Sequence, residues 1–449
     1  MAEQNPRPGQ YPPPSGSPVP PPPGAQAHPG HQGAPTAEAA PAPAAAQAAA
    51  PPGAPPAPPA DGPRIIATDS GAVDGLVKCA RCGATEISLN ARTGLLRCAF
   101  CRYEWSAESA DEALGINAEI KGLTGVEIAS GAVDIIPSSD EVLTFKCTAC
   151  GAEVVINTAE STQARCHWCR NTLSMNQQIP NGAVPDMVLP FAIPKEQAVT
   201  SIRAFVKKRR TFANRRFLKE FDPTNVMGVY LPYMVVDLNT HATLTGQGEH
   251  QTRSYTVKRG DDTERRYDAD LYDVGRDFDL YINDLTVESS QERRDFDINT
   301  NSNNIINTVM PFDVENSVRY DSNYLSGFTS ERRDTNREDL LPVAKTQARD
   351  IVRYHAHQTL GFYDRGVRWD DEQITLVGQR WASAYLPVWL YSYHQRKRNG
   401  STFQHYVAVN ARTGETMGSV PVNQPKLLLV SAAVEIVGIF AALMFLFLG

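Results

Sequence analysis

The eight cysteines of this 449-residue chain stand in four C-x-x-C pairs, a spacing that suits metal binding or thiol–disulfide exchange. Fifteen residues separate the pairs within each quartet, so both quartets read C-x2-C-x15-C-x2-C. The first quartet is Cys79, Cys82, Cys98 and Cys101, and the second is Cys147, Cys150, Cys166 and Cys169. Two facing C-x-x-C turns place four thiolates at tetrahedral corners, which is the arrangement that Zn2+ prefers. The sequence therefore predicts two Zn2+ ions per chain.

The spacing alone leaves other uses of the cysteines open. Structural disulfides are typical of secreted chains, and this sequence lacks the basic start and apolar run of a signal peptide. A thioredoxin-like redox pair would lie in a βαβ pattern, which surrounds none of the four pairs. Iron is a rival metal, and ligands shared between the quartets are a rival pairing. Because an all-cysteine zinc site leaves no position open to water, the predicted sites are structural and not catalytic.

Short β-hairpins are expected to position these ligands. In the first quartet, Ile87 and Leu89 alternate with polar residues before a turn at 90–94, as in a hairpin strand. In the second quartet, AEVVINTAESTQAR predicts a similar hairpin. Two such ribbons on a flexible arm would offer two rigid recognition surfaces.

The long middle region has the patterns of an α+β module. Pro194 begins a helical segment with one apolar face, formed by Ala198, Ile202, Phe205 and Val206. Residues 228–238, GVYLPYMVVDL, have the composition of a buried strand. Residues 267–287 alternate apolar and acidic side chains, which predicts antiparallel strands with one solvated face.

A short internal repeat divides this module. The segment KEQA at 195–198 is echoed by KTQA at 345–348, and each begins a predicted helix. The segment YLP at 230–232 is echoed at 385–387, and each begins a predicted strand. Two related halves of helix-plus-sheet design are therefore expected.

The two ends of the sequence differ from the module. The first 63 residues are rich in Pro and Ala, so they are predicted to be disordered. Residues 427–448 are apolar except for Glu435 and Ser431, and as a helix they would extend ~33 Å, enough to span a bilayer. The predicted location is the cell membrane, crossed once. Reduced cysteines place residues 1–425 in the cytoplasm, with Lys426 at the inner surface and Gly449 outside.

The expected architecture is thus multidomain, with two small β ribbons, an α+β module of antiparallel sheets and one transmembrane helix. The predicted segments are a disordered tail (1–63), zinc ribbon 1 (64–108), a linker (109–140), zinc ribbon 2 (141–178), the α+β module (179–425) and the transmembrane anchor (426–449).

The sequence offers no assembled catalytic motif. Hydrolase, metalloprotease, phosphate-loop and dinucleotide signatures are missing, and the nine histidines are scattered, so the chain is not expected to be an enzyme. A net charge of −7 excludes a polycation, so nucleic-acid binding would need a local basic patch. The basic run Lys207–Lys219, KKRRTFANRRFLK, suits anionic lipid, nucleic-acid phosphate or simply a solvated helix end.

The anchor itself offers a contact surface. Ser431, Glu435, Gly438 and Ala442 share one face of the predicted membrane helix, and small residues there permit close helix approach. A second copy of the chain is therefore a candidate partner, with a lone tolerated Glu435 as the alternative.

The combination resembles a family of bacterial proteins described as TFIIB-type zinc ribbon-containing, some of which are mislabelled as primosomal helicases. The resemblance covers roughly Phe145 to Pro421 and rests on VLPFAIPKEQA, GVYLPYMVVD, NYLSGFTSERRD, YLPVWLYSY and AVNARTGE. It implies an envelope-associated role, beside band-7 and phage-shock-like proteins, and it carries over only the ligands of the second quartet. The first quartet and the Pro/Ala-rich tail depart from the family's simpler pattern.

Two functions follow as expectations. The first is a non-catalytic, membrane-anchored cytoplasmic scaffold that recruits protein partners at the bacterial envelope. The alternative is a membrane-tethered nucleic-acid-binding protein that uses ribbon 1 and the basic run Lys207–Lys219. Steep weakening of binding with rising salt would distinguish the second from the first.

Overall fold

The structure is a computed structural model, and it describes most of the chain between residues 63 and 448. The described ranges are 63–67, 78–114, 119–136, 142–147, 150, 153–158, 161–166, 171–174, 181–259, 262–290, 310–396 and 402–448. The predicted disorder of residues 1–62 lies outside them, as does the predicted ligand Cys169.

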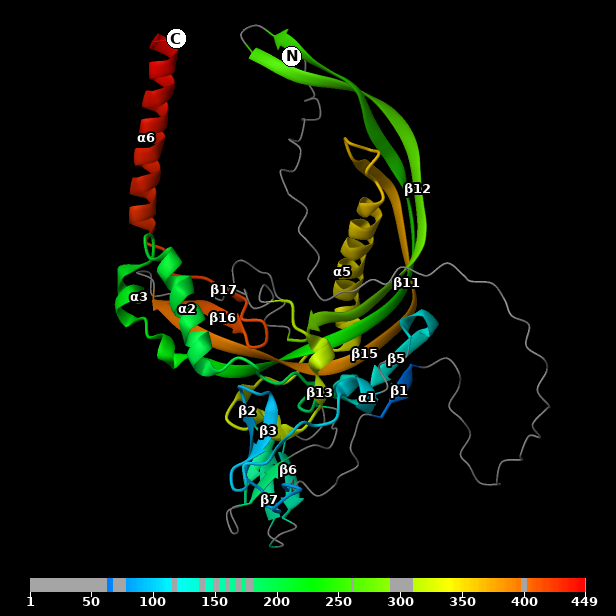
Figure 1. Cartoon of the computed structure of the whole chain (residues 1–449), viewed down its shortest axis with the longest axis vertical. Coiled ribbons are helices and arrows are strands. Elements are labelled where there is room, and N and C mark those ends of the chain that lie inside the picture. The colour runs from blue at the N-terminus through cyan, green and yellow to red at the C-terminus, as the bar shows by residue number, and fades with distance from the viewer. Residues whose placement is uncertain are drawn as a thin grey trace, which may run out of the picture.

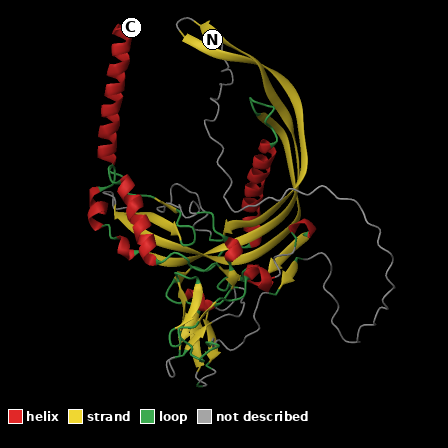
Figure 2. Cartoon of the chain, viewed as in Figure 1, coloured by secondary structure: helices red, strands yellow, loops and turns green. Residues whose placement is uncertain are grey.

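A large mixed sheet organises the molecule (Figures 1 and 2). Ten strands belong to it within the described ranges. Four long ones run antiparallel in the order β12, β11, β15, β16. Four further pairs are parallel: β1 with β5, β5 with β15, β10 with β15, and β14 with β11. The strands are β1 (Arg64–Ile66), β5 (Gly125–Ala129), β10 (Met187–Val188), β11 (Met227–Arg259), β12 (Asp262–Glu288), β13 (Val318–Arg319), β14 (Thr329–Ser330), β15 (Val367–Arg396), β16 (Thr402–Asn410) and β17 (Thr416–Gly418).

Strands β11 and β12 form one long curved hairpin, as the alternating pattern of residues 267–287 predicts. Pairing with β15 reaches as far as Gly248, so residues 249–259 and 262–271 continue as a two-stranded extension. Helix α5 (Arg337–Gln358) lies on the concave side of the curve (Figure 1). Its buried face packs into a core shared with β11 and β12, and consists of Leu340, Ala344, Ala348, Ile351, Val352 and Ala356.

The remaining helices lie mostly near the other end of the sheet. Helix α2 (Lys195–Arg209) buries the predicted apolar face and is followed by the short α3 (Arg215–Glu220). Helix α6 (Gln424–Leu448) rises from the same region (Figure 1). Helix α1 (Ala110–Leu114) lies near β13. Short 3-10 turns η1 (Ile120–Gly122), η2 (Ser130–Ala132), η3 (Pro223–Asn225), η5 (Val314–Asn316) and η6 (Ser322–Leu325) join these elements.

The two YLP segments of the internal repeat pair with each other in the sheet. Residues 230–232 run antiparallel beside residues 385–387, and Leu231 lies directly opposite Leu386. Each repeat supplies a helix followed by a hairpin, α2 with β11–β12 and α5 with β15–β16. The helices are exchanged between the halves, because α5 packs on β12 whereas α2 packs on β16. The two copies of the repeat thus meet antiparallel at the Leu231–Leu386 pair.

The predicted linker is part of this sheet. Strand β5 pairs with β1 on one side and with Gly378–Trp381 of β15 on the other. Residues 64–66 thus lie in the large sheet and not in ribbon 1. The physical reason is that this part of β15 would otherwise leave its backbone groups unpaired at an edge. Gly378 permits the approach, since a Cβ there would lie 2.1 Å from the Leu123 carbonyl oxygen.

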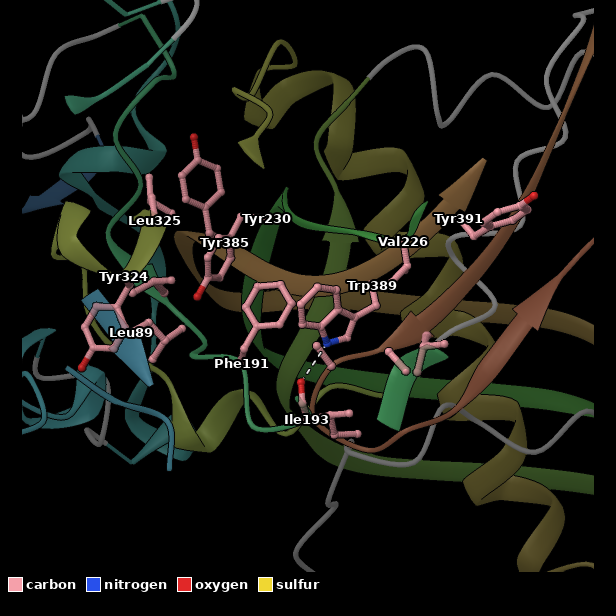
Figure 3. Close-up of a cluster of buried hydrophobic side chains, with 14 of the residues drawn as sticks. Leu89, Phe191, Ile193, Val226, Tyr230, Tyr324, Leu325, Tyr385, Trp389 and Tyr391 are labelled. Carbon is pink, nitrogen blue, oxygen red and sulfur yellow. Dashed lines mark hydrogen bonds between the residues drawn. The ribbon is translucent and has the colours of Figure 1, made fainter. Parts of the chain in front are cut away.

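An aromatic cluster joins ribbon 1 to the sheet (Figure 3). Phe191 is fully buried, and its ring packs edge-on against Tyr230 and Trp389. The Trp389 indole N–H donates to the Ile193 carbonyl oxygen at 2.8 Å. Leu89 of ribbon 1 belongs to the same buried cluster. The ribbon is therefore braced against the body, and the expectation of a flexible arm is not met for it.

A buried ion network crosses the sheet. The Arg380 guanidinium contacts Glu127 Oε2 at 2.9 Å and Asp237 Oδ2 at 3.4 Å, and both Arg380 and Asp237 are almost fully buried. The backbone N–H of Asp284 donates to Asp237 Oδ1 at 3.1 Å. Burial raises the pKa of Asp237 to about 6, although the hydrogen bond from Asp284 and the charge of Arg380 act to lower it. Burial and then the Asp237 charge raise the pKa of Asp284 to about 7.

We expect Asp284→Asn to stabilise the protein at pH 8 and to change little at pH 4. A carboxyl whose pKa rises from 3.8 to about 7 on folding favours the folded state below pH 3.8, and this contribution is lost as pH rises through 7. Asparagine imitates the neutral form and tolerates the φ of +56° at this position. Solvent screening at this half-buried site limits the gain at pH 8 to about 1–2 kcal/mol.

The measurement is chemical unfolding of the full chain in detergent at both pH values. Asp273→Asn is the matched control, because Asp273 lies exposed on the same strand. A gain of equal size at both pH values would show that ionisation of Asp284 is not the cause.

Candidate metal centres

Ribbon 1 places its four cysteines on two tight turns and a three-stranded sheet. The strands are β2 (Ile87–Asn90), β3 (Leu95–Cys98) and β4 (Glu104–Trp105). The first turn is closed by hydrogen bonds from the Gly83 N–H to the Cys79 carbonyl oxygen and from the Cys79 N–H to the Ala84 carbonyl oxygen, both at 2.8 Å. Gly83 has a φ of +74°, which glycine adopts without steric cost. The second turn is closed by the Arg102 N–H, which donates to the Cys98 carbonyl oxygen at 3.2 Å.

The sulfur atoms of ribbon 1 form a compact group. All four lie within 4.8 Å of one another, and the pairs Cys79–Cys101 and Cys82–Cys98 are each 3.6 Å apart. Sulfurs bound to one zinc ion at ~2.3 Å lie ~3.8 Å apart, whereas a disulfide needs ~2.05 Å. The group therefore fits a tetrahedral metal ion and not a pair of disulfides.

Backbone groups favour a thiolate at one of these ligands. Hydrogen bonding from the Cys101 backbone, helped by that of Phe100, lowers the pKa of Cys98 to about 7. The partner Cys82 moves the other way, to a pKa of about 11, even though its largest single contribution, a hydrogen bond with the Ala84 backbone, lowers it. Cys98 therefore ionises more readily than Cys82, and the ionised thiolate is the form that binds a metal ion.

Ribbon 2 brings three of its predicted ligands together. Cys147, Cys150 and Cys166 form a second group, with Sγ atoms of Cys150 and Cys166 3.6 Å apart. Its strands are β6 (Val142–Lys146), β7 (Glu153–Asn157), β8 (Gln163–Arg165) and β9 (Thr172–Ser174). They pair as β6 with β7 and β8 with β9. The two sulfur groups are separate, and the ribbons touch where Thr85 Oγ1 donates to Asn171 Oδ1 at 3.1 Å.

The basic run Lys207–Lys219 lies at the base of α6. It forms the end of α2, a connecting loop and most of α3. Lys426 Nζ, in the first turn of α6, donates to the Thr211 carbonyl oxygen at 2.7 Å. Arg203 lies beside Lys207 and Arg210 in the structure but outside this run, so the sequence analysis did not include it among the basic residues. The spacing could have identified it, since Arg203, Lys207 and Arg210 follow the i, i+4, i+7 spacing of one helix face.

Helix α6 is the one helix in the described part of the chain that is long and apolar enough to cross a membrane. None of its residues from Gln424 to Ala442 is buried. The face formed by Ser431, Glu435, Gly438 and Ala442 is exposed along its length, and a Cβ at Gly438 would meet no neighbour.

The chain is similar to a Bacillus subtilis protein named "uncharacterized protein YdjG". The two are 25% identical over 244 residues, which cover 54% of this chain and 65% of the relative, slightly under two thirds of its length. No family model matches the chain. No solved structure matches it either.

Proposed function

We propose that this chain is a non-catalytic scaffold, held at the cytoplasmic face of the cell membrane by α6, that recruits protein partners through its ribbons and α+β module. Helix α6 carries the proposal. Its side chains include Leu428, Leu429 and Val434, which are 70%, 71% and 67% exposed. Exposed apolar surface of this extent is costly in water and favourable in a bilayer.

The ribbons would supply rigid contact surfaces. Zinc is the proposed metal at both sulfur groups, because the four sulfurs of ribbon 1 and the three described sulfurs of ribbon 2 suit it. With Cys169 as the proposed fourth ligand of ribbon 2, neither site would keep a position open for catalysis. Ribbon 1 presents Phe100 on its second turn, with the side chain 72% exposed. An exposed aromatic on a braced, metal-stabilised turn is a typical anchor for a protein partner.

The resemblance to TFIIB-type zinc-ribbon proteins suggests where such partners lie. Band-7 and phage-shock-like proteins of the bacterial envelope are the first candidates, and self-association through the Gly438 face of α6 is a further one. The nucleic-acid alternative has less support, because Arg97 of ribbon 1 already lies 3.6 Å from Glu104.

Deleting residues 424–449 is expected to move the protein from the membrane fraction to the soluble fraction. The full chain should resist extraction by high salt and by alkaline carbonate, since its attachment is apolar. In-cell cross-linking followed by detergent extraction should recover protein partners with the full chain. Phe100→Ala is expected to reduce that recovery several-fold without unfolding the ribbon, because the side chain is mostly exposed.

Phe362→Ala is the control for Phe100→Ala, since Phe362 is also exposed, at 54%, but lies beside β11 and β12. A full chain that stays soluble would refute the anchor. Binding of the full chain to duplex DNA below 1 μM at about 0.15 M salt, with a steep salt slope that Arg92→Glu with Arg97→Glu abolishes, would replace the scaffold by the alternative.

A further inference from the structure

A small cavity lies between α2 and α3, on the side of the molecule that carries α6. Its volume is about 280 Å³, close to the lower limit of ~300 Å³ for small-molecule pockets. Three cationic side chains line it, those of Arg203, Lys207 and Arg210, and its apolar lining is Val206, Leu218 and Phe221. A cavity with this lining suits a ligand that has an anionic end and an apolar end.

The cations of this cavity are available to a ligand. Within the described residues, Arg203, Lys207 and Arg210 take part in no ion pair, and all three are exposed. Of the neighbouring carboxylates, Glu220 pairs with Arg216 at 2.8 Å. Asp222 accepts hydrogen bonds from the N–H and the hydroxyl of Thr224, and the charge of Arg203 also lowers its pKa. An arriving anion would therefore meet three positive charges, of which Asp222 offsets only that of Arg203.

The same helix pair holds the start of α6. The Asn214 N–H donates to the Pro421 carbonyl oxygen, and the Asn423 N–H donates to the Phe212 carbonyl oxygen, each at 2.7 Å. Lys426 reaches the Thr211 carbonyl oxygen from the first turn of α6. Three hydrogen bonds thus fix the loop between α2 and α3 at the point where the apolar helix begins. If α6 spans a bilayer, this loop lies at the level of the lipid headgroups.

We propose that the cavity binds the headgroup of an anionic phospholipid, and this inference rests on the membrane anchoring proposed above. Arg203, Lys207 and Arg210 hold the phosphate, and Leu218 and Phe221 contact the glycerol and the upper acyl chain. A solvated helix end would explain cations near the C-terminus of α2, but it would not explain their convergence with apolar groups on one cavity. Position beside the anchor favours lipid over nucleic acid, because surface cations gain ~1 kcal/mol each near an anionic leaflet.

The test uses the full chain in nanodiscs of phosphatidylcholine with a minor share of phosphatidylglycerol. We expect phosphatidylglycerol to be retained with the protein after transfer to detergent, as counted by native mass spectrometry. The triple variant Arg203→Gln, Lys207→Gln, Arg210→Gln should retain at least tenfold less. Its three side chains are exposed, so its unfolding temperature should stay near that of the original chain.

The control is Lys258→Gln, Lys345→Gln, Arg349→Gln, which removes the same charge from exposed positions on β11 and α5. Equal loss in both variants would overturn the site in favour of general surface charge. Displacement of the lipid by inorganic phosphate would assign the cavity to a free anion, and displacement by duplex DNA at about 0.15 M salt would assign it to nucleic acid. A chain that enters nanodiscs without preferring phosphatidylglycerol refutes this site alone, whereas a chain that does not enter them refutes the anchor.

Discussion

Cys98→Ser is expected to remove one of two zinc ions from the purified chain and to unfold ribbon 1. Cys98 is fully buried at the end of β3, so a serine there leaves three thiolates that cannot close a tetrahedral site. A structural zinc contributes ~10–16 kcal/mol of apparent binding free energy at pH 7, far more than a ribbon this small gains from its own apolar contacts. Leu96, which is fully buried, would then lose its packing in the hydrophobic cluster that ribbon 1 shares with the large sheet.

Elemental analysis should show the metal content fall from two zinc ions per chain to one. Hydrogen exchange at residues 87–98 should become faster, while exchange in β15 should stay unchanged. Ser88→Ala is the control, because Ser88 is exposed on the neighbouring strand β2. A content of less than one zinc per chain before mutation, or mainly iron, would contradict the assignment of the metal.

Arg380→Ala is expected to lower the free energy of unfolding by about 3–5 kcal/mol. The substitution leaves the buried Asp237 without its cation, whereas Glu127 keeps its pair with Arg64 at 3.0 Å. An uncompensated buried charge is among the most costly defects in a protein core. The loss should be greatest at neutral and alkaline pH. It should shrink as pH falls toward about 6 and be small below that, because Arg380 lowers the pKa of Asp237 and the carboxyl takes up a proton more readily in the variant.

Arg368→Ala tests whether the position of the ion pair matters. Arg368 lies on the same strand and pairs with Asp370 at 3.3 Å, but its side chain is 76% exposed. Exposed pairs contribute ~0–1 kcal/mol, so this variant should unfold almost like the original chain. Equal effects of the two substitutions in denaturant unfolding would mean that the buried network does not stabilise the sheet.

Local patterns predicted the elements whose stability depends on near neighbours. The apolar face of α2, the strand that begins near Gly228 and the hairpin turn at 90–94 all follow from spacing within a few residues. The cysteine spacing likewise predicted which sulfurs lie together among the described residues. These features need no knowledge of the rest of the chain.

Features that depend on distant partners could not be read in this way. Strand β5 was expected to be linker because five residues show little periodicity, and its partner on β15 lies about 250 residues away. The bracing of Leu89 by the aromatic cluster needs Phe191 and Tyr324 from other segments. The cavity between α2 and α3 likewise needs α3 folded back on α2, although its cations share one helix face in the sequence.

The antiparallel meeting of the two repeat segments at Leu231 and Leu386 makes this chain resemble a homodimer whose two subunits have been joined end to end. The helix of each half packs on a strand of the other half, as exchanged elements do in a domain-swapped dimer. Such an arrangement is what fusion of a duplicated gene produces, and the peptide link then acts mainly by raising the local concentration of one half near the other. The ends of the sheet differ, since α6 begins beside α2 and α3 whereas the long β11–β12 hairpin extends past α5.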